Sequence, residues 1–78
     1  MKLKEKITGI RKNKFIELLE NNNIFFDILD YSIVCEITPT NYFTYFPKSD
    51  KLQIHKSNQW ILLGYDYIQK LIEENKKI

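Results

Sequence analysis

The chain has 78 residues, a formal net charge of +2 and one cysteine, Cys35. This length predicts a single domain with a small core, and one cysteine excludes an internal disulfide, which fits a reducing compartment. The first residues are charged and contain no apolar run, so we expect neither a signal peptide nor a membrane span.

The residue usage indicates an AT-rich gene. Lysine occurs eleven times against one arginine, isoleucine twelve times and asparagine seven times, and alanine is absent. Lysine, isoleucine and asparagine have AT-rich codons, whereas alanine and arginine codons are GC-rich. We therefore expect a gene from an AT-rich bacterium, its phage or another mobile element, and a protein that acts in the cytoplasm of a bacterial host.

The N-terminal segment is basic and the remainder of the chain is acidic. Residues 1–14 have a net charge of +5, and the remaining residues have a net charge of −3. The pattern predicts one domain over residues 1–78, in which residues 1–9 form a basic and flexible arm. Such an arm is either a solubilising tail or a contact for phosphate or an acidic partner. The residues expected to make that contact are Lys2, Lys4, Lys6, Arg11 and Lys12.

A helix is expected from Ile10 to the three asparagines at 21–23. Phe15, Leu18 and Leu19 recur at helical spacing and predict a buried stripe. The asparagines end the helix because Asn tolerates the left-handed conformation of a C-cap. The candidate N-caps are Asn13 and, for a longer helix, Thr8.

The middle of the chain predicts antiparallel strands joined by short turns. Residues 24–29 form an apolar run, and residues 32–38 alternate so that Ile33, Cys35 and Ile37 share one face. We expect a tight turn at Asp30 and Tyr31. A second turn follows Pro39, which has no N–H to give to a ladder.

The next predicted strand, from Tyr42 to Phe46, has four aromatic residues in five positions. Phe43 and Tyr45 point to one face, and Tyr42, Thr44 and Phe46 point to the other. Since two helices can cover only one face of a small sheet, we expect Phe43 and Tyr45 in the core. Tyr42 and Phe46 are then left on an open face.

A proline-led turn at residues 47–50 precedes another expected strand. In this strand Leu52 and Ile54 share one face, and Gln53 and His55 lie opposite. The last helix is expected to begin at a cap, Ser57 or Asn58. It would bury Trp60 and would hold Gly64 either in close contact with the sheet or at a kink.

These elements predict an α+β fold. We expect a single small domain, an antiparallel meander of three to four strands flanked by an N-terminal and a C-terminal helix.

The sequence shows no pattern of catalytic, metal or cofactor sites. With only Cys35 and His55 as soft ligands, and no CxxC or HxxxH spacing, a metal site is not expected. Two glycines leave no phosphate-binding loop. Cys35 alternates with isoleucines, so we expect a structural thiol. The protein is therefore expected not to be an enzyme and to hold no cofactor.

The open face is the expected partner-binding surface. Lysines beside an aromatic strand also suit single-stranded nucleic acid, whereas Asp27, Asp30 and Glu36 would repel phosphate. A homodimer without an external ligand is a third alternative. The residues expected to bind the partner are Tyr42, Phe46, Lys48, Lys51, Gln53 and His55.

The segment from Tyr45 to His55, followed by Asn58, Trp60 and Gly64, carries the pattern YxPKxxKLxI…NxWxxxG. This pattern resembles that of small proteins from phages and prophages of AT-rich bacteria, which are similar in style to anti-CRISPR and other anti-defence inhibitors. The resemblance implies no catalytic residue. It implies stoichiometric binding to a host protein or ribonucleoprotein complex, with an RNA-guided CRISPR nuclease as the leading candidate.

Overall fold

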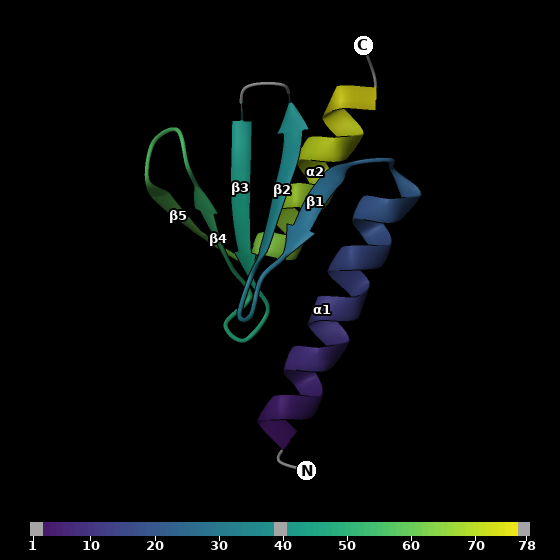
Figure 1. Ribbon diagram of the computed structural model, residues 1–78. Coiled ribbons are helices and arrows are strands. Elements are labelled where there is room, and N and C mark those ends of the chain that lie inside the picture. Colours follow the sequence, from purple (N-terminus) through teal and green to yellow (C-terminus); the bar gives the residue numbers. More distant parts are fainter. Residues whose placement is uncertain (1–2, 39–40, 77–78) are drawn as a thin grey trace.

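A helix at each end of the chain flanks a five-stranded antiparallel sheet (Figure 1). The computed structural model describes residues 3–38 and 41–76. The predicted fold class is confirmed, with more strands than expected. The elements are α1 (Leu3–Asn21), β1 (Phe25–Ile28), β2 (Ile33–Thr38), β3 (Asn41–Phe46), β4 (Lys51–Ile54), β5 (Gln59–Leu62) and α2 (Gly64–Lys76).

The sheet is a plain meander, because each strand pairs with its neighbour in the sequence in the order β1-β2-β3-β4-β5. The expected turn at Asp30 and Tyr31 is confirmed by a backbone bond from Leu29 N to Ser32 O at 2.8 Å. Asp50 and Asn58 have positive φ values of 53° and 56°, which Asp and Asn tolerate better than most residues. The expected turn at Pro39 and Thr40 lies outside the described residues.

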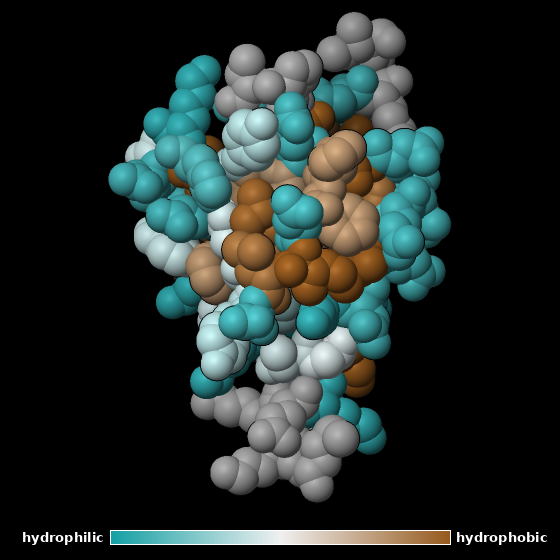
Figure 2. Space-filling model, viewed as in Figure 1, coloured by the Kyte–Doolittle hydropathy of each residue, from teal (hydrophilic) through white to brown (hydrophobic). Residues whose placement is uncertain are grey.

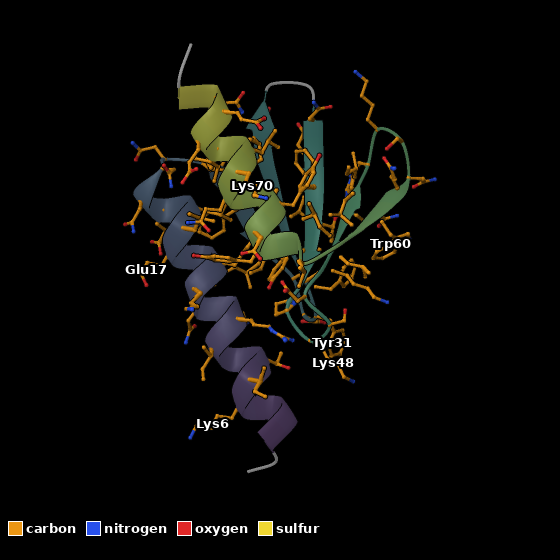
Figure 3. All side chains as sticks on the ribbon, turned by 180° about the vertical axis from the view of Figure 1, so that it is seen from behind. Lys6, Glu17, Tyr31, Lys48, Trp60 and Lys70 are labelled. Atoms are coloured by element: carbon orange, nitrogen blue, oxygen red, sulfur yellow. The ribbon has the colours of Figure 1, made fainter. Side chains whose placement is uncertain are left out.

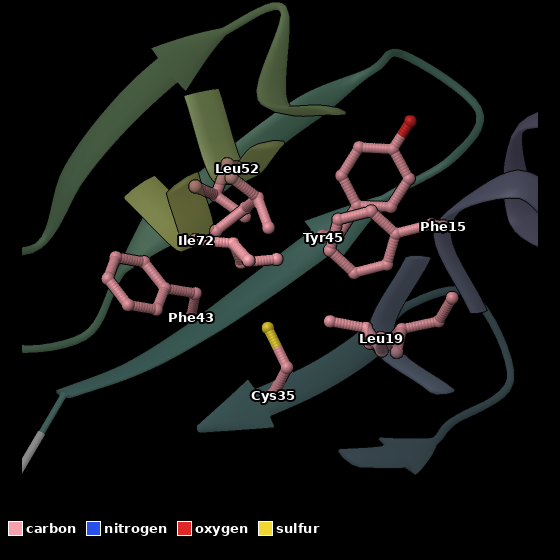
Figure 4. Packing of buried hydrophobic residues seen from close by; sticks show 9 residues of the cluster. Phe15, Leu19, Cys35, Phe43, Tyr45, Leu52 and Ile72 are labelled. Carbon is pink, nitrogen blue, oxygen red and sulfur yellow. The ribbon is translucent and has the colours of Figure 1, made fainter. Parts of the chain in front are cut away.

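Both helices cover the same face of the sheet, as the view from behind shows (Figure 3). Phe43 and Tyr45 project from β3 into this core and are almost fully buried, as the alternation predicted. The ring of Phe15 from α1 stacks on Tyr45 with a centroid distance of 4.0 Å (Figure 4). The buried core residues are Phe15, Leu19, Ile33, Cys35, Phe43, Tyr45, Leu52, Ile68 and Ile72.

The expected start of the first helix was wrong, because α1 begins at Leu3 and not at Ile10. Gly9 lies within this helix, where open space surrounds the position of a side chain. A glycine inside a helix costs only about 1 kcal/mol relative to alanine, so Gly9 does not end it. The segment expected to be an arm is therefore mostly helical. Lys2 lies outside the described residues.

The expected place of Trp60 was also wrong. Trp60 lies in β5 and is 53% exposed, whereas α2 begins only at Gly64. The proposed caps, Ser57 and Asn58, lie in the turn between β4 and β5. The short apolar run at residues 60–63 fits a strand and a helix equally well, and in the structure Gln59–Leu62 pairs with β4 as an antiparallel strand.

Gly64 is the first residue of α2 and not a position in its middle. A Cβ atom there would lie 2.9 Å from Leu52 Cβ and 3.1 Å from Tyr45 Cδ1. The expected close contact between this glycine and the sheet is therefore confirmed, and the kink is not needed to explain it.

Candidate binding surface

The side of the sheet turned away from the helices, the open face, carries aromatic and aliphatic side chains that neither helix covers. Strand pairing arranges its residues in three rows. The long row crosses all the strands at Asp27, Val34, Thr44, Gln53 and Trp60. The flanking rows are Phe25, Glu36 and Tyr42 on one side and Phe46, Lys51 and Leu62 on the other.

Phe46 and Trp60 form an aromatic pair on this face, with ring centroids 5.4 Å apart. Phe46 belongs to β3 and is half-buried, whereas Trp60 belongs to the edge strand β5 and is half-exposed. The pair lies beside Leu62, which is 71% exposed. Large apolar side chains that are exposed next to one another often mark an interaction surface.

Tyr42, Thr44 and His55 form a second group on the open face. The Thr44 hydroxyl is hydrogen-bonded to Nε2 of His55, and the His55 ring lies 6.5 Å from that of Tyr42. Thr44 is buried under its neighbours although it faces away from the core, and Tyr42 is 46% exposed. The centre of the face is therefore ordered by side-chain contacts while its rim is open to solvent.

A further apolar patch covers β1 and β2 on the same face. Phe25 is 79% exposed and stands two residues from Asp27 along the edge strand β1. Figure 2, which looks onto the open face, shows apolar side chains gathered over β1 and β2 and hydrophilic side chains around them. The open face thus carries its most exposed apolar side chains on the edge strands, at Phe25 on β1 and at Trp60 and Leu62 on β5, with the polar residues Thr44 and Gln53 between them.

The structure brings the predicted partner-binding residues to one side of the molecule. Tyr42, Phe46, Gln53 and His55 lie on the open face, Lys51 lies in the same row as Phe46, and Lys48 stands in the turn after β3. Gln53 is held by its own neighbour, because its amide donates to Oδ1 of Asn58 at 3.3 Å.

The basic residues of the first helix separate into two groups. Arg11 and Lys12 face the turn between β3 and β4, and Arg11 Nη1 donates to the carbonyls of Pro47 and Lys48 at 3.3 Å each. Arg11 is therefore a structural residue and not part of a free arm. Lys6 is exposed near the N-terminal end of this helix, to which Lys4 also belongs.

Two adjoining hollows lie at the lower end of the sheet. The first, which we call the turn pocket, has a volume of about 550 Å³ and lies between α1 and the turns at residues 29–32 and 46–49. The second, the Trp60 hollow, is shallower, has a volume of about 430 Å³ and is lined by Trp60 and Leu62. Phe46 and Ser49 line both hollows.

Cys35 lies in the core and away from both hollows. Burial raises the pKa of its thiol from 9.0 to about 12, so the nucleophilic thiolate is not populated at neutral pH. In the described part of the chain, no three His, Cys, Asp or Glu side chains gather as a metal site would need. Neither described helix is long and apolar enough to cross a membrane.

Comparisons with protein-family models, with curated protein sequences and with solved structures found no match.

Three exposed residues of this surface were missing from the sequence prediction: Phe25, Trp60 and Leu62. Trp60 and Leu62 were missed because residues 59–62 were assigned to a helix. Their alternation with Gln59 and Ile61 was the available signal, since a period of two places Trp60 and Leu62 on one face. Phe25 needed the register of β1 against β2, which the sequence leaves open.

Proposed function

We propose that this protein is a non-catalytic inhibitor that binds a host defence complex through the open face and blocks it by occlusion. The observation that carries the proposal is the set of aromatic groups at Tyr42, Phe46 and Trp60 on the face that neither helix covers, two of which, Phe46 and Trp60, are paired. Tyrosine and tryptophan dominate the binding energy of protein interfaces. The partner class, an RNA-guided nuclease, comes from the sequence pattern that begins at Tyr45.

The charges around the open face favour a protein partner. Asp27 belongs to β1, Glu36 to β2 and Lys51 to β4. A surface with acids at one side and lysine at the other suits a partner of mixed charge, and complementary charge gives specificity and speeds encounter. A phosphate backbone laid along the same rows would meet both carboxylates.

A second candidate function is binding of single-stranded nucleic acid. It is favoured by Lys48 and Lys51, each of which lines a hollow together with Phe46, and Lys51 lines the same hollow as Trp60. Bases stack on such rings while lysines track the backbone. Salt separates the two functions, because contacts with phosphate make affinity fall steeply as the salt concentration rises.

The test is an interference assay in cells that carry an active RNA-guided nuclease and receive a targeted plasmid. We expect the protein to restore transformation, and Trp60→Ala and Tyr42→Ala each to weaken binding to the purified nuclease–guide complex by about 1–3 kcal/mol. Lys70→Ala is the matched control, because Lys70 is exposed on α2, on the helix side of the molecule (Figure 3).

Folding of each variant is checked by thermal unfolding followed by circular dichroism. Trp60→Ala should keep the fold, because a half-exposed side chain contributes little to the core, whereas Phe43→Ala should lose it. The proposal is overturned if the open-face variants restore transformation as fully as the Lys70 control. It is also overturned if the protein binds oligonucleotides with steep salt dependence and does not bind the nuclease.

A further inference from the structure

The turn pocket and the Trp60 hollow are neighbouring depressions, and both are lined by Phe46 and Ser49. We call the two together the Phe46 groove. It runs from α1, past the turns that end β1 and β3, to the edge strand β5. Figure 3 shows Tyr31 and Lys48 side by side at the lower end of the sheet, where the groove begins.

The turn pocket is mostly apolar and is large enough to take a large apolar side chain with neighbouring chain atoms. Its volume falls within the range of about 300–1,000 Å³ that small-molecule sites occupy. Leu29, Ile33 and Pro47 line it. Tyr31 is 86% exposed at its border, although it is a large aromatic residue. A bound apolar group would remove much of this surface from water.

The walls of the turn pocket are tied together before any partner arrives. Arg11 on α1 holds the turn after β3 through its two bonds to the carbonyls of Pro47 and Lys48. The opposite wall is closed by the bond from Leu29 N to Ser32 O. A site that is already formed loses less conformational entropy when it binds.

The charges of the groove are mostly positive. Lys12 and Lys48 line the turn pocket, Lys51 lines the Trp60 hollow, and Asp30 is the one carboxylate among the residues that line either hollow. Among the described residues none of these three lysines makes an ion pair. Each therefore remains available to a carboxylate of a partner.

We propose that the Phe46 groove receives a peptide segment of the protein partner in which a large apolar residue is flanked by Asp or Glu. This proposal rests on the proposed function and names the chemistry of the partner at that same surface. The apolar residue enters the turn pocket, the acids meet Lys12, Lys48 and Lys51, and the segment continues over Phe46 to Trp60. A nucleic acid is the less suitable occupant, because the turn pocket is mostly apolar and offers few polar groups to base edges.

The experiment selects ligands for the full chain from a random peptide library displayed on filamentous phage. Binders are retained on the wild-type protein after removal of those that also bind the double variant Tyr31→Ala, Lys48→Glu. We expect the enriched peptides to share a large apolar residue next to Asp or Glu. Enrichment of basic peptides, or no enrichment on the wild type over the double variant, overturns the proposal.

A charge exchange then separates recognition from a structural effect. For a synthetic peptide of the selected sequence, Lys48→Glu should weaken binding about tenfold, and replacing the acids of the peptide by lysine should restore binding to that variant. Lys70→Glu, which makes the same charge change on α2, should leave both affinities unchanged. Loss of binding in Lys48→Glu that the lysine peptide does not rescue contradicts the proposal.

The two proposals fail in different ways. If Lys48→Glu and Tyr31→Ala keep full activity in the interference assay while Tyr42→Ala, which changes an open-face residue outside both hollows, loses it, the open face binds the defence complex and the groove proposal is wrong. If selected peptides bind the groove with the predicted charge rule but no variant affects interference, the groove proposal stands and the proposed function is wrong.

Discussion

At the scale of single residues, two buried groups, Cys35 and Tyr45, should make the fold less stable at alkaline pH. Burial raises the pKa of the Cys35 thiol to about 12. Burial also raises the pKa of the Tyr45 phenol, and the hydrogen bond that its hydroxyl donates to Asp50 raises it further. In the unfolded chain both groups ionise at lower pH. The stability that depends on their neutral forms is therefore complete below about pH 9 and is lost as the pH rises above it.

Replacing Cys35 by alanine should reveal how much of the loss of stability at alkaline pH comes from the thiol. Between pH 8 and about pH 10.5, ionisation of the unfolded Cys35 should remove about 2 kcal/mol from the free energy of unfolding of the wild type. Cys35→Ala should be less stable at neutral pH but should lose about 2 kcal/mol less over the same range. Urea unfolding at a series of pH values measures this, and parallel curves for the two proteins would show that the thiol is not shielded as the structure indicates.

At the scale of elements, Asp50 joins the turn after β3 to the start of α2. Its Oδ1 accepts a bond from the Tyr45 hydroxyl at 2.8 Å and another from the backbone N of Tyr65 at 3.3 Å. Its own carbonyl accepts from Gly64 N at 2.9 Å. The first N–H groups of a helix need such partners, and here they are supplied by a residue from a different element.

We expect Asp50→Gly to lower the free energy of unfolding by about 1–3 kcal/mol, because the buried Tyr45 hydroxyl loses its acceptor. Glycine is the suitable replacement, since φ at this position is 53°. Asp50→Asn keeps an acceptor oxygen and should recover part of the loss. Asp66→Asn is the control, as Asp66 is exposed in the first turn of α2. Equal effects at positions 50 and 66 in urea unfolding would mean that charge near the helix end, and not the bonds of Asp50, stabilises α2.

The elements also show what the sequence could predict. Alternation along β2 and β3 predicted which side chains enter the core, because a buried face selects apolar residues at every second position. The start of α1 was missed because its first turns bury little: from Lys6 to Lys14 no side chain is fully buried. β5 was missed because Trp60 and Leu63 have the spacing of a helix as well as belonging to an apolar run.

The candidate site also has a part that the sequence could predict and a part that it could not. Tyr42 and Phe46 were predicted for the open face from the period of a single strand. The turn pocket could not be predicted, because it is made by residues of α1 and of two separate turns. Arg11 on α1 bonds to the carbonyls of Pro47 and Lys48 in the turn that forms one wall, and no local pattern indicates which turn a helix residue will meet.

At the scale of the whole molecule, the two helices cover one face of the sheet and leave the other open. The apolar core lies between the helices and the sheet, so we expect substitutions at exposed open-face positions such as Tyr42 and Trp60 to leave the fold intact, whereas the buried Thr44 is an exception. The proposed Phe46 groove adjoins the open face at the lower end of the sheet and reaches toward α1. We therefore expect substitutions of core residues to lower the free energy of unfolding, and substitutions of exposed residues on the open face and in the groove to weaken binding of the proposed partner.

The strand order has a consequence for how the chain reaches this structure. Because each strand pairs with its sequence neighbour, the sheet can form hairpin by hairpin from contacts of short loop length, and proteins rich in such contacts fold fast. Docking of the helices would come later. We expect Ile33→Val to slow folding and Ile68→Val mainly to speed unfolding in stopped-flow chevrons, and equal Φ values would contradict this order. Rapid folding suits the proposed role, since an inhibitor of a defence nuclease has to be in place before the nuclease cuts.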